Sequence, residues 1–414
     1  MFLNFSENDD PRHFFTLPFE DGLQISCLPF EKRCFLHQSG RLPKINAGTP
    51  PVPESLYSRL QKLSILPNNR CNFHCSYCYA AASKDNNELD KKQLFQAIST
   101  FFSLPERNDA SVSFLGGGEP LLSQDTVLPA IDFIRKIAPD IPVNIVTNGS
   151  VLNKNLKDFL LRQNVSVTVS FEVLPDIQEI QRGSHALVSR NIKELLASGI
   201  KVKIRTILTD KNIHRIREMA STVQKEYAGI TRWLIEPVSA WSYFESAETA
   251  MDFWNAYTEA LEELSALPEM KNISWNSLFK RFFSSCSGIY CDGEFVVMPS
   301  GEIGLCHRIS SPASPLWQRW LWGEFDGRKY QLFPHRAESF YKVPERMAKR
   351  CSRCPAFACC GGNCRILAEE AEEEYIDSYC SFIRKCFFEY LRKSCREVLK
   401  HRSLPVSGYL EVKI

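Results

Sequence analysis

Residues 71–78 read CNFHCSYC and place Cys71, Cys75 and Cys78 on a spacing of three and then two intervening residues. Thiolates at this spacing can hold three corners of one metal cluster, and they leave the fourth corner without a protein ligand. A tetrahedral zinc site needs a fourth ligand, and His74 lies in a loop too constrained to supply it. We therefore interpret the stretch as the ligand set of a [4Fe–4S] cluster with one open iron.

The composition limits the classes of protein to consider. The 414 residues predict two or three structural units, and the formal net charge of +2 gives no support for a nucleic-acid partner. MFLNFSENDDPRHFF does not resemble an export signal, and no stretch is apolar for long enough to cross a bilayer, so we expect a cytoplasmic protein without a membrane partner. Eleven of the 16 cysteines follow residue 285, and clustered thiols in a reducing compartment indicate metal or redox chemistry.

From about residue 62, short β-rich runs alternate with longer amphipathic segments. One helical pattern, NIKELLASG (191–199), closes on a glycine suited to a helix C-cap. Six β-then-α units predict a parallel sheet or an open barrel, since eight would close a full barrel. The predicted strands are KLSIL (62–66), SVSFL (111–115), PVNIVT (142–147), VSVTVSF (165–171), KVKIRTIL (201–208) and RWLIEP (232–237).

The unusual residues of this segment follow the ends of the predicted strands. CNFHCSYC follows the first strand, GGGEP (116–120) the second and TNG (147–149) the third, while Ser170 closes the fourth strand and Glu236 ends the sixth. In parallel α/β folds, sites form at the carboxyl ends of the strands. We therefore expect these residues to lie along one rim of the sheet.

CNFHCSYC matches the CxxxCxxC signature of radical S-adenosylmethionine (SAM) enzymes, and GGGEP resembles their Gly-Gly-Glu-Pro segment. The resemblance implies that SAM chelates the open iron and that an electron from the cluster cleaves SAM. The cleavage would give a 5′-deoxyadenosyl radical, which abstracts hydrogen from the substrate. Glycines let a backbone approach a cofactor closely, and a glutamate can face an ammonium group. Taken singly, each contact also has a structural explanation, such as a tight turn. The implied SAM contacts are Tyr77, Gly117, Gly118, Glu119, Asn148, Ser170 and Arg182.

The later cysteines form a second pattern, in which three cysteines precede a CxxCx5CxxxC group and one last cysteine. This order resembles the SPASM extension of radical SAM proteins, which binds two auxiliary [4Fe–4S] clusters. Two zinc sites are the alternative, because CxxC pairs serve zinc equally well. By the resemblance, the first auxiliary cluster is ligated by Cys286, Cys291, Cys306 and Cys364, and the second by Cys351, Cys354, Cys360 and Cys380.

The predicted fold class is α/β, a partial (β/α)6 radical SAM barrel with a cysteine-rich SPASM domain. Residues 1–60 form an extended, β-rich leader with a hairpin signal at Asp21-Gly22, and AGTPPVPES (47–55) is a plausible linker. The barrel covers 61–275, the SPASM domain 276–385, and a C-terminal helix and tail 386–414. The remaining cysteines are expected to be buried, inert thiols, namely Cys27, Cys34, Cys359, Cys386 and Cys395.

Enzymes with a SPASM extension resemble one another in acting on peptides or proteins. Sulfatase maturases carry an aspartate directly after the cysteine numbered Cys306 here, whereas this chain has His307. Histidine can act as a base near neutral pH, but packing beside a cluster is an equal alternative. This departure, and a leader able to grip a precursor by strand addition, favour an enzyme that crosslinks a ribosomal peptide.

Two other functions remain open at this point. One is a sulfatase-maturing enzyme that forms formylglycine, and the other is a non-catalytic zinc or iron–sulfur scaffold. For either enzyme, the resemblance implies three [4Fe–4S] clusters and SAM as cofactors. It also implies a ferredoxin or flavodoxin as electron donor, with a precursor peptide or a sulfatase as substrate.

Overall fold

The structure is a computed structural model that describes residues 10–41, 55–80, 86–277, 286–310, 312, 314–405 and 408–414. The six predicted strands are all present, and each is followed along the chain by helical structure. Their alternating β-branched and aliphatic residues suit a sheet buried under helices. The strands are β4 (Lys62–Ile65), β5 (Ser111–Phe114), β6 (Val143–Thr147), β7 (Val165–Ser170), β8 (Val202–Leu208) and β9 (Arg232–Pro237).

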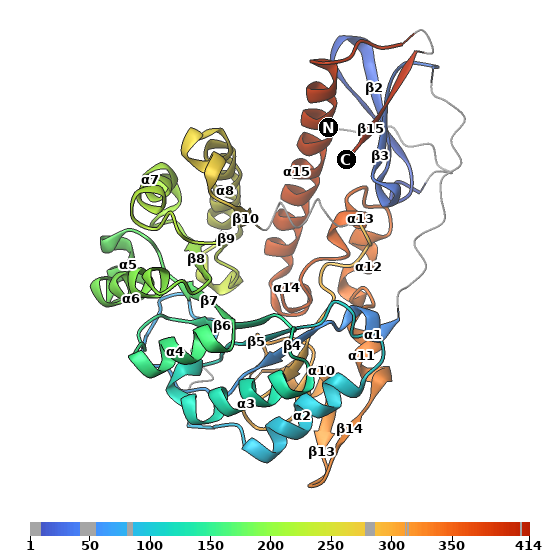
Figure 1. The fold of residues 1–414 in the computed structure, drawn as a ribbon. Helices are drawn as coiled ribbons and strands as arrows, with labels where there is room; N and C mark the ends of the chain where they lie inside the picture. The colour runs from blue at the N-terminus through green and yellow to red at the C-terminus, as the bar shows by residue number, and fades with distance from the viewer. Residues whose placement is uncertain are drawn as a thin grey trace.

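These six strands are mutually parallel and form the centre of an 11-stranded sheet with the order β10-β9-β8-β7-β6-β5-β4-β11-β12-β13-β14. β10 (Trp275–Ser277) and β11 (Phe295–Val297) add one parallel strand at each side of the six. Three antiparallel strands complete the sheet, namely β12 (Ile303–Gly304), β13 (Leu321–Phe325) and β14 (Tyr330–Leu332). The predicted fold class, an α/β partial barrel followed by a cysteine-rich region, is confirmed (Figure 1).

Helices cover the outer face of the parallel strands, and several begin at capping side chains. Asp90, Asn153 and Ser246 each accept a hydrogen bond from a first-turn backbone N–H. The predicted helix end at Gly199 is confirmed, since Gly199 follows α6 with a φ of +77°. The helices are α2 (Lys91–Ser103), α3 (Gln124–Ile137), α4 (Lys154–Arg162), α5 (Pro175–Gln181), α6 (His185–Ala197), α7 (Ile216–Glu226) and α8 (Ala247–Ala266).

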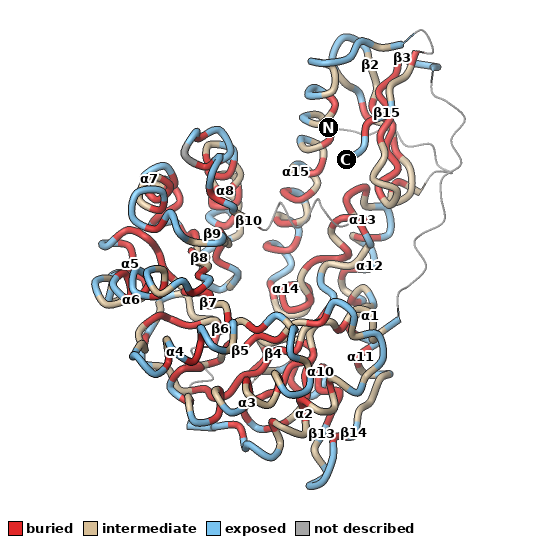
Figure 2. The backbone as a smooth tube through the Cα atoms, in the orientation of Figure 1, coloured by how far each residue is buried: buried red, intermediate tan, exposed pale blue. Residues whose placement is uncertain are grey.

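Burial alternates along β8, and this pattern separates the two faces of the sheet (Figure 2). Val202, Ile204 and Leu208 are buried in the core, whereas Lys203 and Arg205 are only half-buried. Because successive side chains of a strand point to opposite faces, the half-buried set lines the inner face of the barrel.

A second sheet joins the two ends of the described chain. Its strands are β1 (Phe15–Pro18), β2 (Leu23–Leu28), β3 (Arg33–Gln38) and β15 (Tyr409–Lys413), and the hairpin predicted at Asp21-Gly22 joins β1 to β2. β15 pairs antiparallel with β3, whereas the sequence predicted only a helix and tail after residue 386. The signal missed was the alternation in YLEVK (409–413). The predicted linker 47–55 lies, apart from Ser55, outside the described residues.

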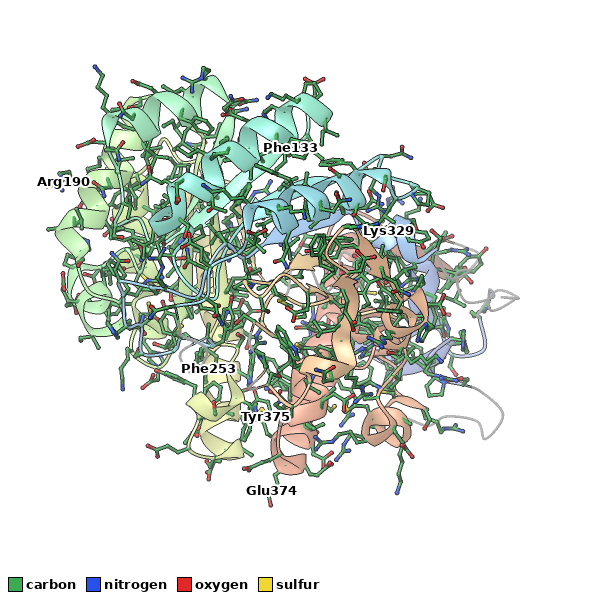
Figure 3. All side chains as sticks on the ribbon, turned by 90° about the horizontal axis from the view of Figure 1, so that it is seen from below. Phe133, Arg190, Phe253, Lys329, Glu374 and Tyr375 are labelled. Carbon is green, nitrogen blue, oxygen red and sulfur yellow. The ribbon has the colours of Figure 1, made fainter. Side chains whose placement is uncertain are left out.

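Short helices and one long helix make up the cysteine-rich region. The C-terminal helix predicted within 386–414 is present but begins earlier, as α15 (Glu373–Leu399), which packs on α8 where Phe253 and Tyr375 are labelled in Figure 3. No described helix is long and apolar enough to span a bilayer. The three boundaries between the four predicted domains stay predictions. The short helices are α1 (Leu56–Arg59), which precedes the barrel, and α10 (Trp317–Trp320), α11 (Pro334–Phe340), α12 (Glu345–Cys351), α13 (Phe357–Cys360) and α14 (Arg365–Glu370).

Candidate active site

The three-cysteine loop follows β4 at the carboxyl edge of the parallel sheet. Cys71, Cys75 and Cys78 are free and half-buried. Burial raises the pKa of Cys75, Arg182 lowers it, and the nearby thiols of Cys78 and Cys71 raise it further. The three sulfur atoms therefore share one site, to which Arg182 brings a positive charge.

Neighbouring loops hold this cysteine loop in place. The amide nitrogen of Asn148, which follows β6, donates to Oδ1 of Asn72 at 2.9 Å. Asn72 in turn donates to the hydroxyl of Ser150 at 2.9 Å, and the backbone N–H of Ser76 donates to the carbonyl of Gln181 at 3.0 Å. Asn148, a predicted SAM contact, thus helps to hold the cysteine loop in place. Its contact with SAM stays a prediction.

The GGGEP segment packs against the residues that lead into the cysteine loop. The N–H of Gly118 donates to the carbonyl of Asn68 at 3.2 Å, and the N–H of Glu119 donates to the carbonyl of Arg70 at 2.7 Å. A Cβ added to Gly118 would lie 2.0 Å from the carbonyl oxygen of Arg70, and one added to Gly117 would lie 2.4 Å from Oδ1 of Asn69. The two glycines are therefore required for close backbone packing, whether or not they also face SAM.

Glu119 is buried and already accepts three hydrogen bonds. Its carboxylate accepts from the hydroxyl of Thr147 at 2.7 Å, from the N–H of Leu121 at 3.0 Å and from the N–H of Asn148 at 2.6 Å. Burial raises the pKa of Glu119, and these hydrogen bonds offset the rise only in part. A carboxylate offers about four acceptor positions, so Glu119 has room for one further donor such as an ammonium group.

Tyr77, Glu172 and Arg182 form a buried polar network beside the cysteine loop. The hydroxyl of Tyr77 donates to Glu172 and accepts from Nη1 of Arg182 at 2.8 Å, while Arg182 and Glu172 lie 3.6 Å apart. Burial raises the pKa of Glu172 to about 7, opposed by Arg182, Tyr77 and the N–H of Ile207. Arg182, whose side chain is 10% exposed, is therefore a fixed and largely shielded cation, and Ser170 lies half-buried at the end of β7 nearby.

The sequence did not single out Glu172. It stands two residues after Ser170, just past the carboxyl end of β7. The rule that site residues lie at the carboxyl ends of parallel strands applies to Glu172 equally well. Glu172 could therefore have been predicted from this rule.

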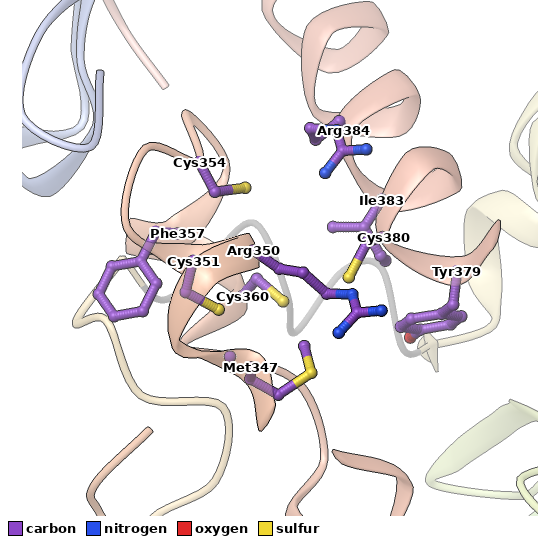
Figure 4. Close-up of a pocket in the computed structure, with 11 residues that line it drawn as sticks. Met347, Arg350, Cys351, Cys354, Phe357, Cys360, Tyr379, Cys380, Ile383 and Arg384 are labelled. Atoms are coloured by element: carbon purple, nitrogen blue, oxygen red, sulfur yellow. The ribbon is translucent and has the colours of Figure 1, made fainter. Parts of the chain in front are cut away.

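Four cysteines of the C-terminal region line one pocket. Their sulfur atoms point into a common space, and Arg350, Arg384 and Met347 complete its wall (Figure 4). Burial raises the pKa of Cys351 and of Cys360 most, and the charges of neighbouring thiols raise it further. This is the set predicted for the second auxiliary cluster, namely Cys351, Cys354, Cys360 and Cys380.

The set predicted for the first auxiliary cluster is only partly brought together. Burial raises the pKa of Cys306, and the charges of Cys364 and Cys291 raise it further, so these three thiols are neighbours. Cys286 lies elsewhere, with its Sγ 3.0 Å from the Sγ of Cys359. The chain passes α13 at this point, and this path places Cys286 beside Cys359, which belongs to neither of the two predicted ligand sets.

The five cysteines expected to be inert are mostly buried. Cys27 stands directly opposite Cys34 across β2 and β3, and the thiols of Cys34, Cys359 and Cys286 all act on it. Cys395 is buried as well, whereas Cys386 is half-buried on α15.

His307 links the cysteine-rich region to the rim of the barrel. Its Nδ1 lies 3.0 Å from the carboxylate of Glu294, and its ring meets that of Tyr79, next to Cys78, edge to face at 6.2 Å. Glu294 also accepts from Lys62 at 2.7 Å and from Ser64 at 2.5 Å. Burial raises the pKa of Glu294, but His307 and Lys62 outweigh it and hold the pKa well below its usual value.

The residues present fit the cofactors that the cysteine loop implies. Nε of Arg182 is buried without a hydrogen-bond partner among the described residues, as expected for a group that faces an anionic ligand. In the part of the chain described, no three His, Cys, Asp or Glu side chains are placed to hold a single metal ion. A four-iron cluster keeps its thiolates further apart than one ion does, because irons and sulfides lie between them.

Comparison with known proteins finds a superfamily match for part of the barrel. Residues 65–223 match the model of the radical SAM superfamily. This match covers less than half of the chain and assigns radical SAM character to the barrel segment that it spans. Among curated relatives, it is 25% identical to the radical SAM cyclopropyl synthase TigE of Paramaledivibacter caminithermalis over 33% of this chain and 30% of TigE. The chain spans about half or less of the length of the curated relatives it matches.

Two solved structures share the fold over most of the chain. Native anSMEcpe with bound AdoMet has a TM-score of 0.62 at 16% identity, covering 81% of this chain and 99% of that one. Streptococcus suis SuiB bound to precursor peptide SuiA has a TM-score of 0.53 at 17% identity, covering 76% and 74%. The radical SAM chain is therefore similar in fold to SPASM enzymes, including the cysteine-rich region.

Proposed function

We propose that this radical SAM enzyme modifies a ribosomally synthesised peptide by installing a crosslink, thioether or carbon–carbon, or a related modification. The observation that carries the proposal is the bridge from Tyr79 through His307 to Glu294, because it brings the cysteine-rich region to the edge of the three-cysteine loop. Two fold neighbours support a peptide substrate, since SuiB is bound to a precursor peptide and anSMEcpe to the Cp18Cys peptide.

The residues around the cysteine loop have separate tasks in this proposal. Cys71, Cys75 and Cys78 hold the [4Fe–4S] cluster, and Arg182, fixed by Glu172 and Tyr77, faces the carboxylate of SAM. When bound, the cluster and SAM supply a radical that abstracts hydrogen from an unactivated carbon. The buried network excludes water from this side of the site, which protects a reactive species.

His307 serves as the base in this scheme. Its Nδ1 donates to Glu294, so Nε2 is left to accept a proton from the peptide. Glu294 is itself held ionised by Lys62, and a carboxylate in this position orients the imidazole and stabilises its charged form. The later cysteines would hold two auxiliary clusters, which would supply a path for the electron that the peptide loses, and a ferredoxin or flavodoxin is the proposed electron donor.

Anaerobic reconstitution followed by co-expression tests the proposal. We expect about a dozen irons per chain for three four-iron clusters, cleavage of SAM after reduction, and a loss of two hydrogens from a short peptide encoded beside the gene. Purified protein with zinc and no sulfide would contradict the enzyme altogether. Modification of a sulfatase to formylglycine would favour the alternative substrate instead.

The role of His307 has its own test. We expect His307→Gln to lower peptide modification by about a hundredfold or more, the usual range for loss of a general base, while SAM cleavage persists. His214→Gln, at an exposed position, is the matched control. If His307→Gln modifies the peptide at the control rate, His307 only packs against Tyr79 and Glu294.

A further inference from the structure

The inner face of the barrel carries three neighbouring cations on two adjacent strands. Lys203 and Arg205 are two residues apart on β8, so their side chains leave the same face of the sheet. Arg232, at the start of β9, stands directly opposite Lys203. Ser170, on β7, stands directly opposite Arg205, so Arg205 is the member of the set that lies beside a predicted SAM contact. We call Lys203, Arg205 and Arg232 the basic face.

The basic face lacks a counter-ion among the described residues. No hydrogen bond or ion pair joins any of its three side chains to a described carboxylate, and Nε of Arg205 is buried without a partner. Burial lowers the pKa of Lys203, and the charges of Arg232 and Arg205 lower it further. By contrast, Arg33 and Arg350 on the surface each hold two carboxylates.

Two of the neighbouring inward positions carry no charge. Thr168 stands opposite Lys203 and donates its hydroxyl to Asn144 at 3.0 Å, so both of these groups are neutral and engaged. Glu236 lies further along β9, opposite Ile207, and has an interaction of its own. Lys203 and Arg205 are half-buried and lose hydration, and the exposed Arg232 adds a third like charge that repels them. A bound anion would offset both the repulsion and the lost hydration.

We propose that the basic face binds a carboxylate of the peptide substrate. The inference rests on the proposed function, because it assumes that a peptide enters the barrel beside Ser170. Carboxylates are the anionic groups of an unmodified peptide, and an arginine presents its donors in a fork that matches them. The carboxylate belongs either to an aspartate or glutamate side chain or to the free C-terminus, and both present the same chemistry to Arg205 and Lys203.

Three short synthetic peptides distinguish these sources when tested on the anaerobically reconstituted enzyme. Acetyl-Gly-Glu-Gly-amide carries a side-chain carboxylate, acetyl-Gly-Gln-Gly with a free C-terminus carries a terminal one, and acetyl-Gly-Gln-Gly-amide carries none. Equilibrium dialysis with quantification of the peptide by mass spectrometry gives each affinity. We expect one or both carboxylate peptides to bind about tenfold more tightly than the neutral one, the scale of a charge-assisted pair.

Substitutions in the basic face provide the control. Arg205→Gln and Lys203→Met should each reduce the preference for a carboxylate to about threefold or less, and Arg205→Lys should retain part of it. Lys201→Gln, at an exposed position just before β8, should leave the preference unchanged. Since the added anion relieves repulsion, malonate should also raise the melting temperature of the wild type more than that of Arg205→Gln, at equal ionic strength.

Equal binding of the three peptides to the wild type, or binding of none, overturns the proposal. A carboxylate preference that survives both Arg205→Gln and Lys203→Met overturns it as well. These outcomes are separate from the fate of the proposed function. SAM cleavage and peptide modification measured on the wild type decide that function, and they can hold while the basic face proves irrelevant to binding.

Discussion

The barrel and the cysteine-rich region both gather thiols, but they do so with different amounts of supporting structure. The loop of Cys71, Cys75 and Cys78 rests on a parallel sheet whose strands and capped helices bury a continuous aliphatic core. The long helix α15 carries Cys380, but most of the other later cysteines lie on or beside strands of two to five residues and helices of four to seven residues. Because helices this short are marginal without packing, metal is expected to contribute to folding in the second region and to chemistry alone in the first.

The largest effect should follow from a change in the barrel loop. Cys78→Ala removes one of three thiolates, so we expect SAM cleavage to be abolished and about four irons per chain to be lost. The melting temperature should change little, because Asn148 and the backbone of Gln181 hold the loop without metal. Iron analysis, SAM turnover and thermal unfolding check these outcomes, and substantial turnover would contradict the site.

A matched change in the other region should lower stability as well as iron content. Cys380→Ala opens the four-thiol pocket, and we expect a fall in melting temperature of about 5 °C or more, since a lost structural metal removes folding free energy. Cys386→Ala, on the same helix but outside the pocket, is the control. Equal melting temperatures for the two variants would remove the distinction between the regions.

A smaller effect is expected at Glu172. Glu172→Gln keeps the shape of the side chain but removes the charge that faces Arg182 at 3.6 Å, so we expect SAM to bind about tenfold more weakly. Equilibrium binding of SAM under anaerobic conditions measures this directly, with iron content unchanged. Glu194→Gln, on the exposed side of α6, should bind SAM like the wild type.

The same carboxyl group should give a pH dependence of stability. Burial raises the pKa of Glu172 to about 7, above its ordinary value near 4.5, so the folded protein binds a proton that the unfolded chain has released. Its contribution to stability is therefore present at low pH and is lost as the pH rises from about 4.5 through 7. Urea unfolding at several pH values should show a shallower decline for Glu172→Gln than for Glu194→Gln.

The smallest effect should come from Cys286. Its Sγ lies 3.0 Å from that of Cys359, whereas Cys291, Cys306 and Cys364 are neighbours of one another. We expect Cys286→Ala to keep most of its iron, and Cys364→Ala to lose about four irons. Equal losses in the two variants would show that Cys286 moves to the auxiliary cluster when iron is present, as the family resemblance implies.

Regular elements of the fold could be predicted because local pattern and core packing agree for them. The six strands at 62–237, the hairpin at Asp21-Gly22 and the helix from Glu373 were all visible in periodicity and turn residues. β15 could not be placed, because pairing with β3 joins segments from opposite ends of the chain. Periodicity describes a strand, but it does not name the partner of that strand.

For the site, the sequence by itself determined which residue types are available and in what spacing: three cysteines for an open cluster, GGGEP one strand later, and the later cysteine series. Tertiary structure decided which side chains meet, including Glu172 with Arg182, Glu294 with His307, and Cys286 with Cys359. The physical reason is distance. Charges and hydrogen bonds act over a few ångströms in space, and residues as far apart in the chain as Lys62 and Glu294, separated by 232 positions, become neighbours only after the strands have paired.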